Sequence, residues 1–63
     1  MNKILTVEQV AEKSGFNIKQ IETITKRKGF LRFENTEFGI KAVFEIKRDG
    51  ETVIHSADFT YYI

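Results

Sequence analysis

The amino-acid sequence predicts an α+β fold in which two N-terminal helices precede a three-stranded antiparallel sheet, in the order ααβββ. Apolar residues recur with helical spacing up to residue 28 and with a spacing of two from residue 30 onward. The Asp49-Gly50 pair lies between two alternating segments, which indicates a two-residue hairpin turn. With 63 residues the chain has room for one core, so residues 1–63 are expected to form a single domain.

The first helix is expected over about residues 6–14. Thr6 and Gln9 have the spacing of a capping box, in which each side chain accepts a hydrogen bond from the other residue's backbone N–H. Gly15 follows the last helical position and suits the left-handed conformation that ends many helices.

The second helix is expected over about residues 17–28. Asn17 and Gln20 repeat the capping signature, and Gly29 follows as the stop. A stripe of isoleucines forms the apolar side, namely Ile18, Ile21 and Ile24. Three cations at the end of this helix complement its exposed carbonyls and its dipole, namely Lys26, Arg27 and Lys28.

Three strands are expected over about residues 30–34, 38–48 and 51–62. A turn at Asp49-Gly50 pairs residues whose numbers sum to 99, which places His55 opposite Phe44 on the apolar side of the sheet. The same register places a complementary charge pair, Lys41 and Asp58, on the opposite, solvent-exposed side of the sheet.

The first two strands are expected to be joined by a loop at Asn35-Thr36, which makes partner numbers sum to 71. Phe33 then lies opposite Phe38, and Leu31 shares the apolar side. An antiparallel sheet commonly buries one side and wets the other, so the two helices are expected to cover this apolar side.

Composition argues against catalysis and against bound metal. The chain has no Cys and one His, so disulfides, thiolate zinc sites and cofactors are not expected. A catalytic nucleophile needs a base, and the base needs a group that orients it. The only His, His55, is expected on the buried side, whereas Ser56 and Asp58 are expected on the opposite side of the sheet. A non-enzymatic protein is expected.

No segment has the length or apolarity of a membrane span or of a signal-peptide core, so a cytoplasmic protein without a membrane partner is expected.

Charge is unevenly distributed along the chain. Residues 1–29 contain six Lys and Arg against three Glu, whereas residues 30–63 contain four against six Asp and Glu. An anionic partner is expected to contact the N-terminal half.

The segment VEQVAEKSGFNIKQIETITK, residues 7–26, resembles a helix-turn-helix. The resemblance rests on small or apolar residues at that family's spacings, namely Val10, Ala11, Gly15, Ile18, Ile21 and Ile24. Together with the following KRKGFL and the strands, residues 7–30 look like the winged DNA-binding domains of excisionases and MerR-type regulators. The resemblance implies double-stranded DNA as a partner and, as DNA-contacting residues, Asn17, Lys19, Gln20, Thr23, Lys26, Arg27 and Lys28.

A protein-interaction module is the alternative. The third strand is expected at the sheet edge, where few charges protect it from pairing with another chain. The expected interface residues are Ile54, Tyr61, Tyr62 and Ile63. Edge pairing of this kind would also allow a homodimer. The short chain suits a phage-encoded or plasmid-encoded regulator, acting on DNA or on a host protein.

Overall fold

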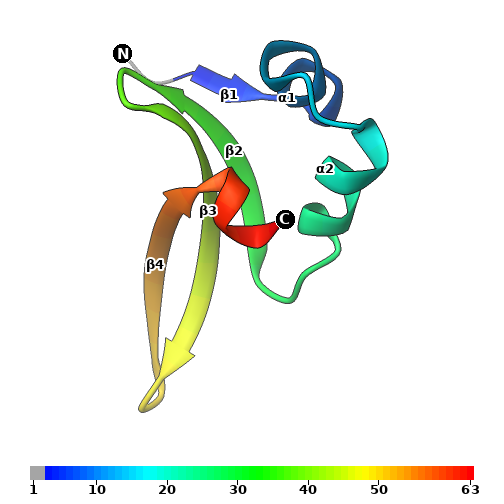
Figure 1. Ribbon diagram of the computed structural model, residues 1–63. Helices are drawn as coiled ribbons and strands as arrows, with labels where there is room; N and C mark the ends of the chain where they lie inside the picture. The colour runs from blue at the N-terminus through cyan, green and yellow to red at the C-terminus, as the bar shows by residue number, and fades with distance from the viewer. Residues whose placement is uncertain (1–2) are drawn as a thin grey trace.

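The computed structural model describes residues 3–63 and contains two short helices packed against one end of a twisted antiparallel sheet (Figure 1). The sheet has the order β1-β2-β3-β4. In chain order the elements are β1 (Lys3–Leu5), α1 (Val7–Ser14), α2 (Ile18–Thr25), β2 (Phe30–Thr36), β3 (Gly39–Arg48), β4 (Glu51–Asp58) and the 3₁₀ helix η1 (Phe59–Tyr62).

The predicted three-stranded ααβββ order is wrong, because a fourth strand, β1, precedes the helices. β1 pairs antiparallel with β2, with Leu5 opposite Phe33. Three residues are too few to show an alternating pattern, so only pairing with β2 makes this segment a strand. Leu5 is buried in the core beside the helices, whereas Ile4 points away and is exposed. The α+β class is correct.

Both predicted capping boxes are present. The Thr6 hydroxyl accepts a hydrogen bond from the Gln9 N–H at 3.1 Å, and the Gln9 side chain accepts one from the Thr6 N–H at 2.8 Å. Gly15 ends α1 with a φ of 79°, and its N–H donates to the Ala11 carbonyl. Local chemistry therefore determines where α1 begins and ends.

The β3–β4 hairpin has the predicted register. Its partners run from Lys41 and Asp58 to Arg48 and Glu51, and every pair sums to 99. Asp49 and Gly50 have φ values of 53° and 79°, the positive angles that a type I′ turn requires at both positions.

The β2–β3 hairpin has a different register from the predicted one. Its loop is Glu37-Phe38, and Thr36 pairs with Gly39, so partner numbers sum to 75 over most of the hairpin. The Thr36 hydroxyl donates to the Gly39 carbonyl at 2.8 Å and accepts from the Phe38 N–H at 3.1 Å. These side-chain hydrogen bonds stabilise a turn that has no sequence signature as strong as Asp-Gly.

A bulge in β2 decides which side chain packs against the core. The register shifts between Phe30 and Arg32, so Phe30, rather than Leu31, lies opposite Phe44. The Phe30 ring packs 4.9 Å from Phe33 and 5.6 Å from Phe44. Leu31, predicted to be buried, is 40% exposed.

The chain leaves the sheet earlier than predicted. β4 ends at Asp58, and residues 59–62 form η1 instead of continuing the strand. The Asp58 carboxylate accepts from the Thr60 hydroxyl at 2.6 Å and from the Thr60 N–H at 3.0 Å. These two hydrogen bonds, with a smaller contribution from the charge of Lys41, lower the pKa of Asp58. The turn carries Phe59 back into the core.

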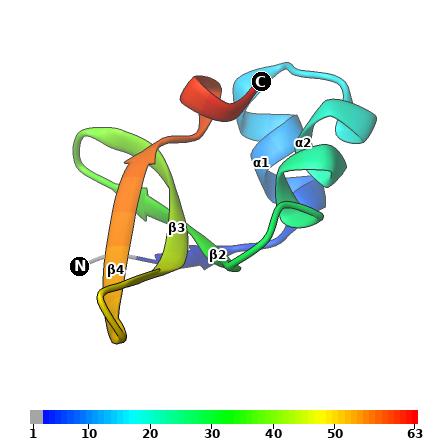
Figure 2. The ribbon, with the colours of Figure 1, turned by 90° about the horizontal axis from the view of Figure 1, so that it is seen from below.

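The core lies between the helices and the proximal half of the sheet. Its buried residues are Leu5, Val10, Ile21, Ile24, Phe33, Ala42, Phe44 and Phe59. The distal half of the β3–β4 hairpin extends beyond the helices (Figures 1 and 2). Ile46 and Val53 in this distal half are therefore nearly half exposed. His55, predicted to be buried, is exposed although it lies opposite the core residue Phe44, because β4 is the edge strand away from the helices (Figure 2). Val43 is buried on the opposite side, between Arg32 of β2 and Ser56 of β4.

Gly29 joins the helical part of the chain to the sheet at very short range. Its carbonyl accepts from the Glu45 N–H at 2.7 Å, its φ is 88°, and a Cβ at this position would collide with the Glu45 carbonyl oxygen. No side chain fits between these two backbones.

Replacing Gly29 with Ala is expected to destabilise the fold by about 2–4 kcal/mol, because it adds a backbone clash to the cost of a left-handed φ. Gly15→Ala is the matched control. Gly15 has a similar φ of 79°, and an added Cβ there would meet open space, so only the conformational cost of about 1–2 kcal/mol applies. Urea unfolding of both variants measures the difference, and equal losses would contradict the role given to the Glu45 contact.

Replacing Phe44 with Ala is expected to destabilise the fold by about 3–5 kcal/mol, because the ring is 5% exposed and packs on Phe30 and Tyr62. Ile46→Ala, two residues along the same side, is expected to cost about 1 kcal/mol, since Ile46 is 44% exposed. Thermal or urea unfolding measures both values. A similar loss in the two variants would show that the helices do not define the limit of the core.

Candidate nucleic-acid interface

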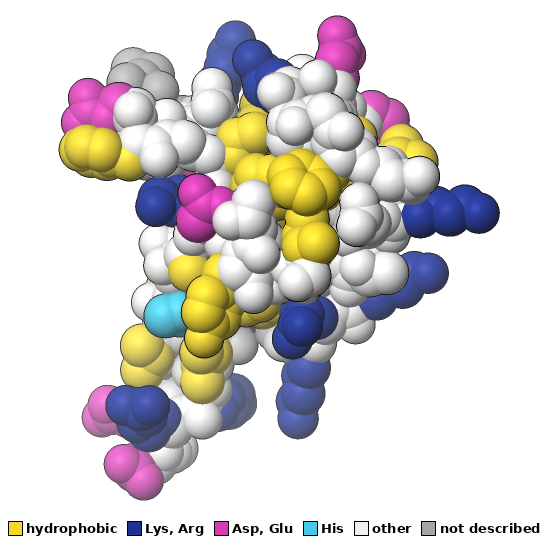
Figure 3. Space-filling view, in the orientation of Figure 1, with side chains coloured by type: hydrophobic (Ala, Val, Ile, Leu, Met, Phe, Trp, Pro, Cys, Tyr) yellow, Lys and Arg dark blue, Asp and Glu magenta, His cyan; other side chains and the backbone are white. Residues whose placement is uncertain are grey.

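One side of α2 packs into the core and the other is open. Ile21 and Ile24 are fully buried, whereas Lys19, Glu22 and Thr23 are exposed. The helix is therefore positioned by its isoleucines and leaves a polar surface available for a ligand. In Figure 3 Lys and Arg side chains project along the side of the molecule that carries α2 and the turn after it.

Two of the predicted DNA-contacting residues have a structural task at the start of α2. The Asn17 side-chain oxygen accepts from the Lys19 N–H at 2.8 Å, and the Gln20 oxygen accepts from the Asn17 N–H at 3.3 Å. Bidentate recognition of adenine requires the oxygen and the amino group of one carboxamide together. The capping box occupies the carboxamide oxygens of Asn17 and Gln20 in part and fixes their orientation, so it competes with bidentate recognition of a base.

The remaining predicted residues on α2 are free to contact a ligand to different degrees. Lys19 is exposed at the start of the helix. The Thr23 hydroxyl donates to the Gln20 carbonyl at 2.6 Å, so it can still accept a hydrogen bond but its proton is engaged. Glu22 is exposed on the same helix and opposes binding of phosphate nearby.

The three consecutive cations lie in a turn, not in the last turn of the helix as predicted. α2 ends at Thr25, and Lys26 is its C-cap. The Arg27 N–H donates to the Ile24 carbonyl and the Phe30 N–H to the Arg27 carbonyl, so the chain reverses over residues 26–29. This reversal is required to bring Gly29 against Glu45. Lys26, Arg27 and Lys28 are all exposed.

Arg27 has a defined position in this turn. Its guanidinium carbon lies 5.4 Å from the centre of the Tyr62 ring, within the range of a cation–π contact. Tyr62 in turn packs on Phe44 at 4.5 Å, which connects the cation to the core. The C-terminal η1 thus holds Arg27 beside the sheet, a contact between residues far apart in sequence.

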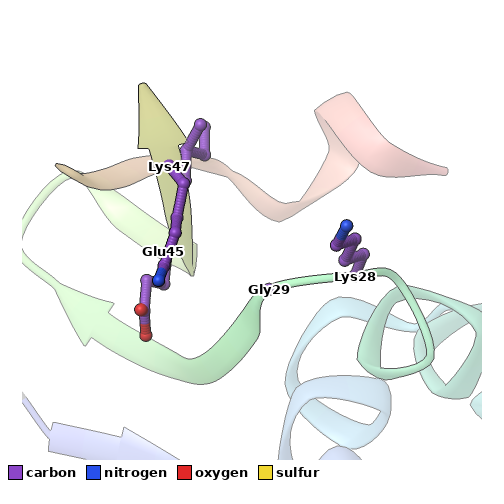
Figure 4. Close-up of a pocket in the computed structure, with 5 residues that line it drawn as sticks. Lys28, Gly29, Glu45 and Lys47 are labelled. Carbon is purple, nitrogen blue, oxygen red and sulfur yellow. The ribbon is translucent and has the colours of Figure 1, made fainter. Parts of the chain in front are cut away.

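A cleft of about 570 Å³ lies beside the contact of the turn with β3, and it is lined by Lys28, Gly29, Glu45, Ile46 and Lys47 (Figure 4). A second, adjacent cleft is lined by Arg27, Lys28, Phe44, Ile46 and Tyr62. Lys28 and Gly29 stand on the turn side and Glu45 and Lys47 on the strand side. Lys28 lines both clefts, whereas Arg27 lines only the second and Lys47 only the first.

Lys47 was not among the predicted contact residues. That Lys47 and Lys28 line the same cleft depends on the Gly29–Glu45 hydrogen bond, which links segments 16 residues apart, and no local pattern indicates such a pairing. The predicted register placed Lys47 on the solvent-exposed side of β3, but this alone does not indicate that it lines a cleft with Lys28.

The predicted protein-interface residues fall on two different elements. Ile54 is 57% exposed on β4, whereas Tyr61 is 77% exposed on η1 and Ile63 follows it. Tyr62 is half-buried against Phe44. They do not form one continuous edge, because Asp58 turns the chain into η1.

Within residues 3–63 no group of three or more His, Asp or Glu side chains is arranged to hold a metal ion. None of the helices in the same range is long and apolar enough to cross a membrane. Comparison with protein-family models, with curated proteins and with solved structures finds no match to this chain.

Proposed function

We propose that the protein is a small non-enzymatic regulator that binds double-stranded DNA in the manner of a winged helix. The observation that supports this most is that Arg27, Lys28 and Lys47 line two adjacent clefts after the end of α2, with Lys28 common to both. Cations that come from two separate elements and line two adjacent clefts suit the successive phosphates of a duplex more than a single small anion.

In this arrangement the turn that contains Lys26, Arg27 and Lys28, called the basic turn below, supplies phosphate contacts. The helix α2 supplies contacts in the major groove. Lys19 and Thr23 are the residues of α2 whose exposure and remaining hydrogen-bonding capacity suit base contact. The β3–β4 hairpin takes the position of a wing, and Lys47 and Arg48 are its cations. Phosphate contacts carry no sequence information, so specificity would depend on α2.

The second candidate function is a protein-interaction module, such as a phage-type or plasmid-type modulator of a host protein. Exposed apolar side chains support it, with Tyr61 at 77% and Ile54 at 57% exposure. Absence of duplex binding at low salt would favour this second function over the first.

Titration of a mixed-sequence DNA duplex tests the first function. If three or four cations neutralise phosphates, the logarithm of affinity is expected to fall against the logarithm of salt concentration with a slope of roughly −3 to −4. Fluorescence anisotropy at several salt concentrations measures the slope. A slope near zero would contradict electrostatic binding by the turn.

The double variant Lys26→Gln/Lys28→Gln is expected to weaken duplex binding and to reduce the magnitude of the salt slope by roughly 1.8, since each phosphate contact contributes about 0.9. The matched control is Lys3→Gln/Lys41→Gln, which removes the same charge from β1 and β3. An equal effect in both double variants would indicate a general effect of net charge and would contradict the proposed interface.

A further inference from the structure

The free edge of β4 differs from the other edge of the sheet. β1 is three residues long and includes Lys3, so it offers little for another strand to pair with. β4 is eight residues long, and the six residues between Glu51 and Asp58 carry no Lys, Arg, Asp, Glu or Pro. The residues that protect natural edges, charged side chains and proline, are missing from its whole centre.

The hairpin register identifies which backbone groups of β4 point outward. Arg48 and Glu51 flank the two-residue turn and form the first hydrogen-bonded pair, after which hydrogen-bonded and non-hydrogen-bonded pairs alternate. The residues in non-hydrogen-bonded pairs direct their N–H and C=O groups away from β3, and these are Thr52, Ile54, Ser56 and Asp58. Their side chains share the side of the sheet opposite the helices.

We infer that β4 pairs antiparallel with β4 of a second copy of this chain, about a two-fold axis at Ile54, to form a continuous eight-stranded sheet. A two-fold axis makes the strand its own partner, so every outward N–H and C=O near the axis meets its complement. In this register partner numbers sum to 108. Ile54 meets Ile54 of the second copy, and Thr52 meets Ser56.

The charges and the exposed apolar side chains of β4 favour this register and favour a second copy of the chain as the partner. Ile54 is 57% exposed, and pairing with its own copy covers it with an equally apolar side chain. On the other side of the sheet Val53, which is 46% exposed, lies opposite His55, and Glu51 lies opposite Ala57. No pair opposes like charges. Shifting the sum to 110 would place His55 against His55 and leave Ile54 opposite Ser56.

The inference does not depend on DNA binding, since the paired edge contains none of the cations of the basic turn. An eight-residue edge buries less area than the roughly 800 Å² per partner of a standard interface, so a weak, concentration-dependent dimer is expected. Dimerisation would present two basic faces related by a two-fold axis.

Sedimentation velocity across a range of protein concentrations tests the dimer. A shift from 7.3 kDa towards twice that mass is expected as concentration rises. Ile54→Lys places two like charges at the axis and is expected to raise the dissociation constant at least roughly tenfold. Phe38→Lys, at a residue 79% exposed in the β2–β3 loop, is the matched control and is expected to leave the dimer unchanged. A mass of one chain at all concentrations, or equal loss in both variants, would overturn the inference.

Single cysteine variants test the register, because the natural chain has no cysteine. Opposed residues in a hydrogen-bonded pair have Cα atoms about 5.5 Å apart, within disulfide range, whereas diagonal neighbours are about 7–8 Å apart. Mild oxidation is expected to crosslink Ile54→Cys much faster than His55→Cys or Phe38→Cys, as measured by non-reducing gel electrophoresis. Faster crosslinking of His55→Cys would overturn the proposed axis at Ile54.

Discussion

The close approach of Gly29 to Glu45 is the contact on which the rest of the structure depends. The hydrogen bond of 2.7 Å between these backbones leaves no space for a side chain, so the end of the helical segment must lie directly against β3. α2 must therefore stop at Thr25, and the chain must reverse within four residues. The bulge that follows in β2 lets Phe30 enter the core and leaves Leu31 outside.

This contact also explains why the cations form a surface. In the turn all three cations are exposed, Lys28 lines one cleft together with Lys47 of β3, and Tyr62 holds Arg27. A constraint on backbone packing thus determines the electrostatic surface.

The small core leaves much of the sheet uncovered. Helices of eight residues each cover only the proximal part, and the distal hairpin extends into solvent with Ile46, Val53 and Ile54 partly exposed. The molecule therefore has two separate surfaces, a basic one at the end of α2 and an uncharged edge along β4. The first suits an anionic polymer and the second suits another strand, and neither prevents use of the other.

Local chemistry in the sequence was sufficient for the capping boxes, the Gly15 stop, the Asp49-Gly50 turn and the register of β3 with β4. Each of these depends on residues close together in the chain or on one turn whose φ values few residues tolerate. The apolar side of α2 was predictable from the spacing of its isoleucines, whereas the place of Lys26, Arg27 and Lys28 in a turn was not, because they were expected in the helix. Lys47 and the Arg27–Tyr62 contact were not predictable, since both join distant segments.

Only tertiary structure decided the strand β1, the loop at Glu37-Phe38, the bulge, the end of α2 and the departure of η1 from the sheet. β1 becomes a strand because β2 offers unpaired backbone groups, and a three-residue segment has no pattern of its own. The β2–β3 register differs from the predicted one by an even number, so it keeps Phe33 on the apolar side, and the alternating pattern cannot distinguish the two. His55 is exposed because β4 is the edge strand away from the helices, and the extent of cover is a property of the packed molecule.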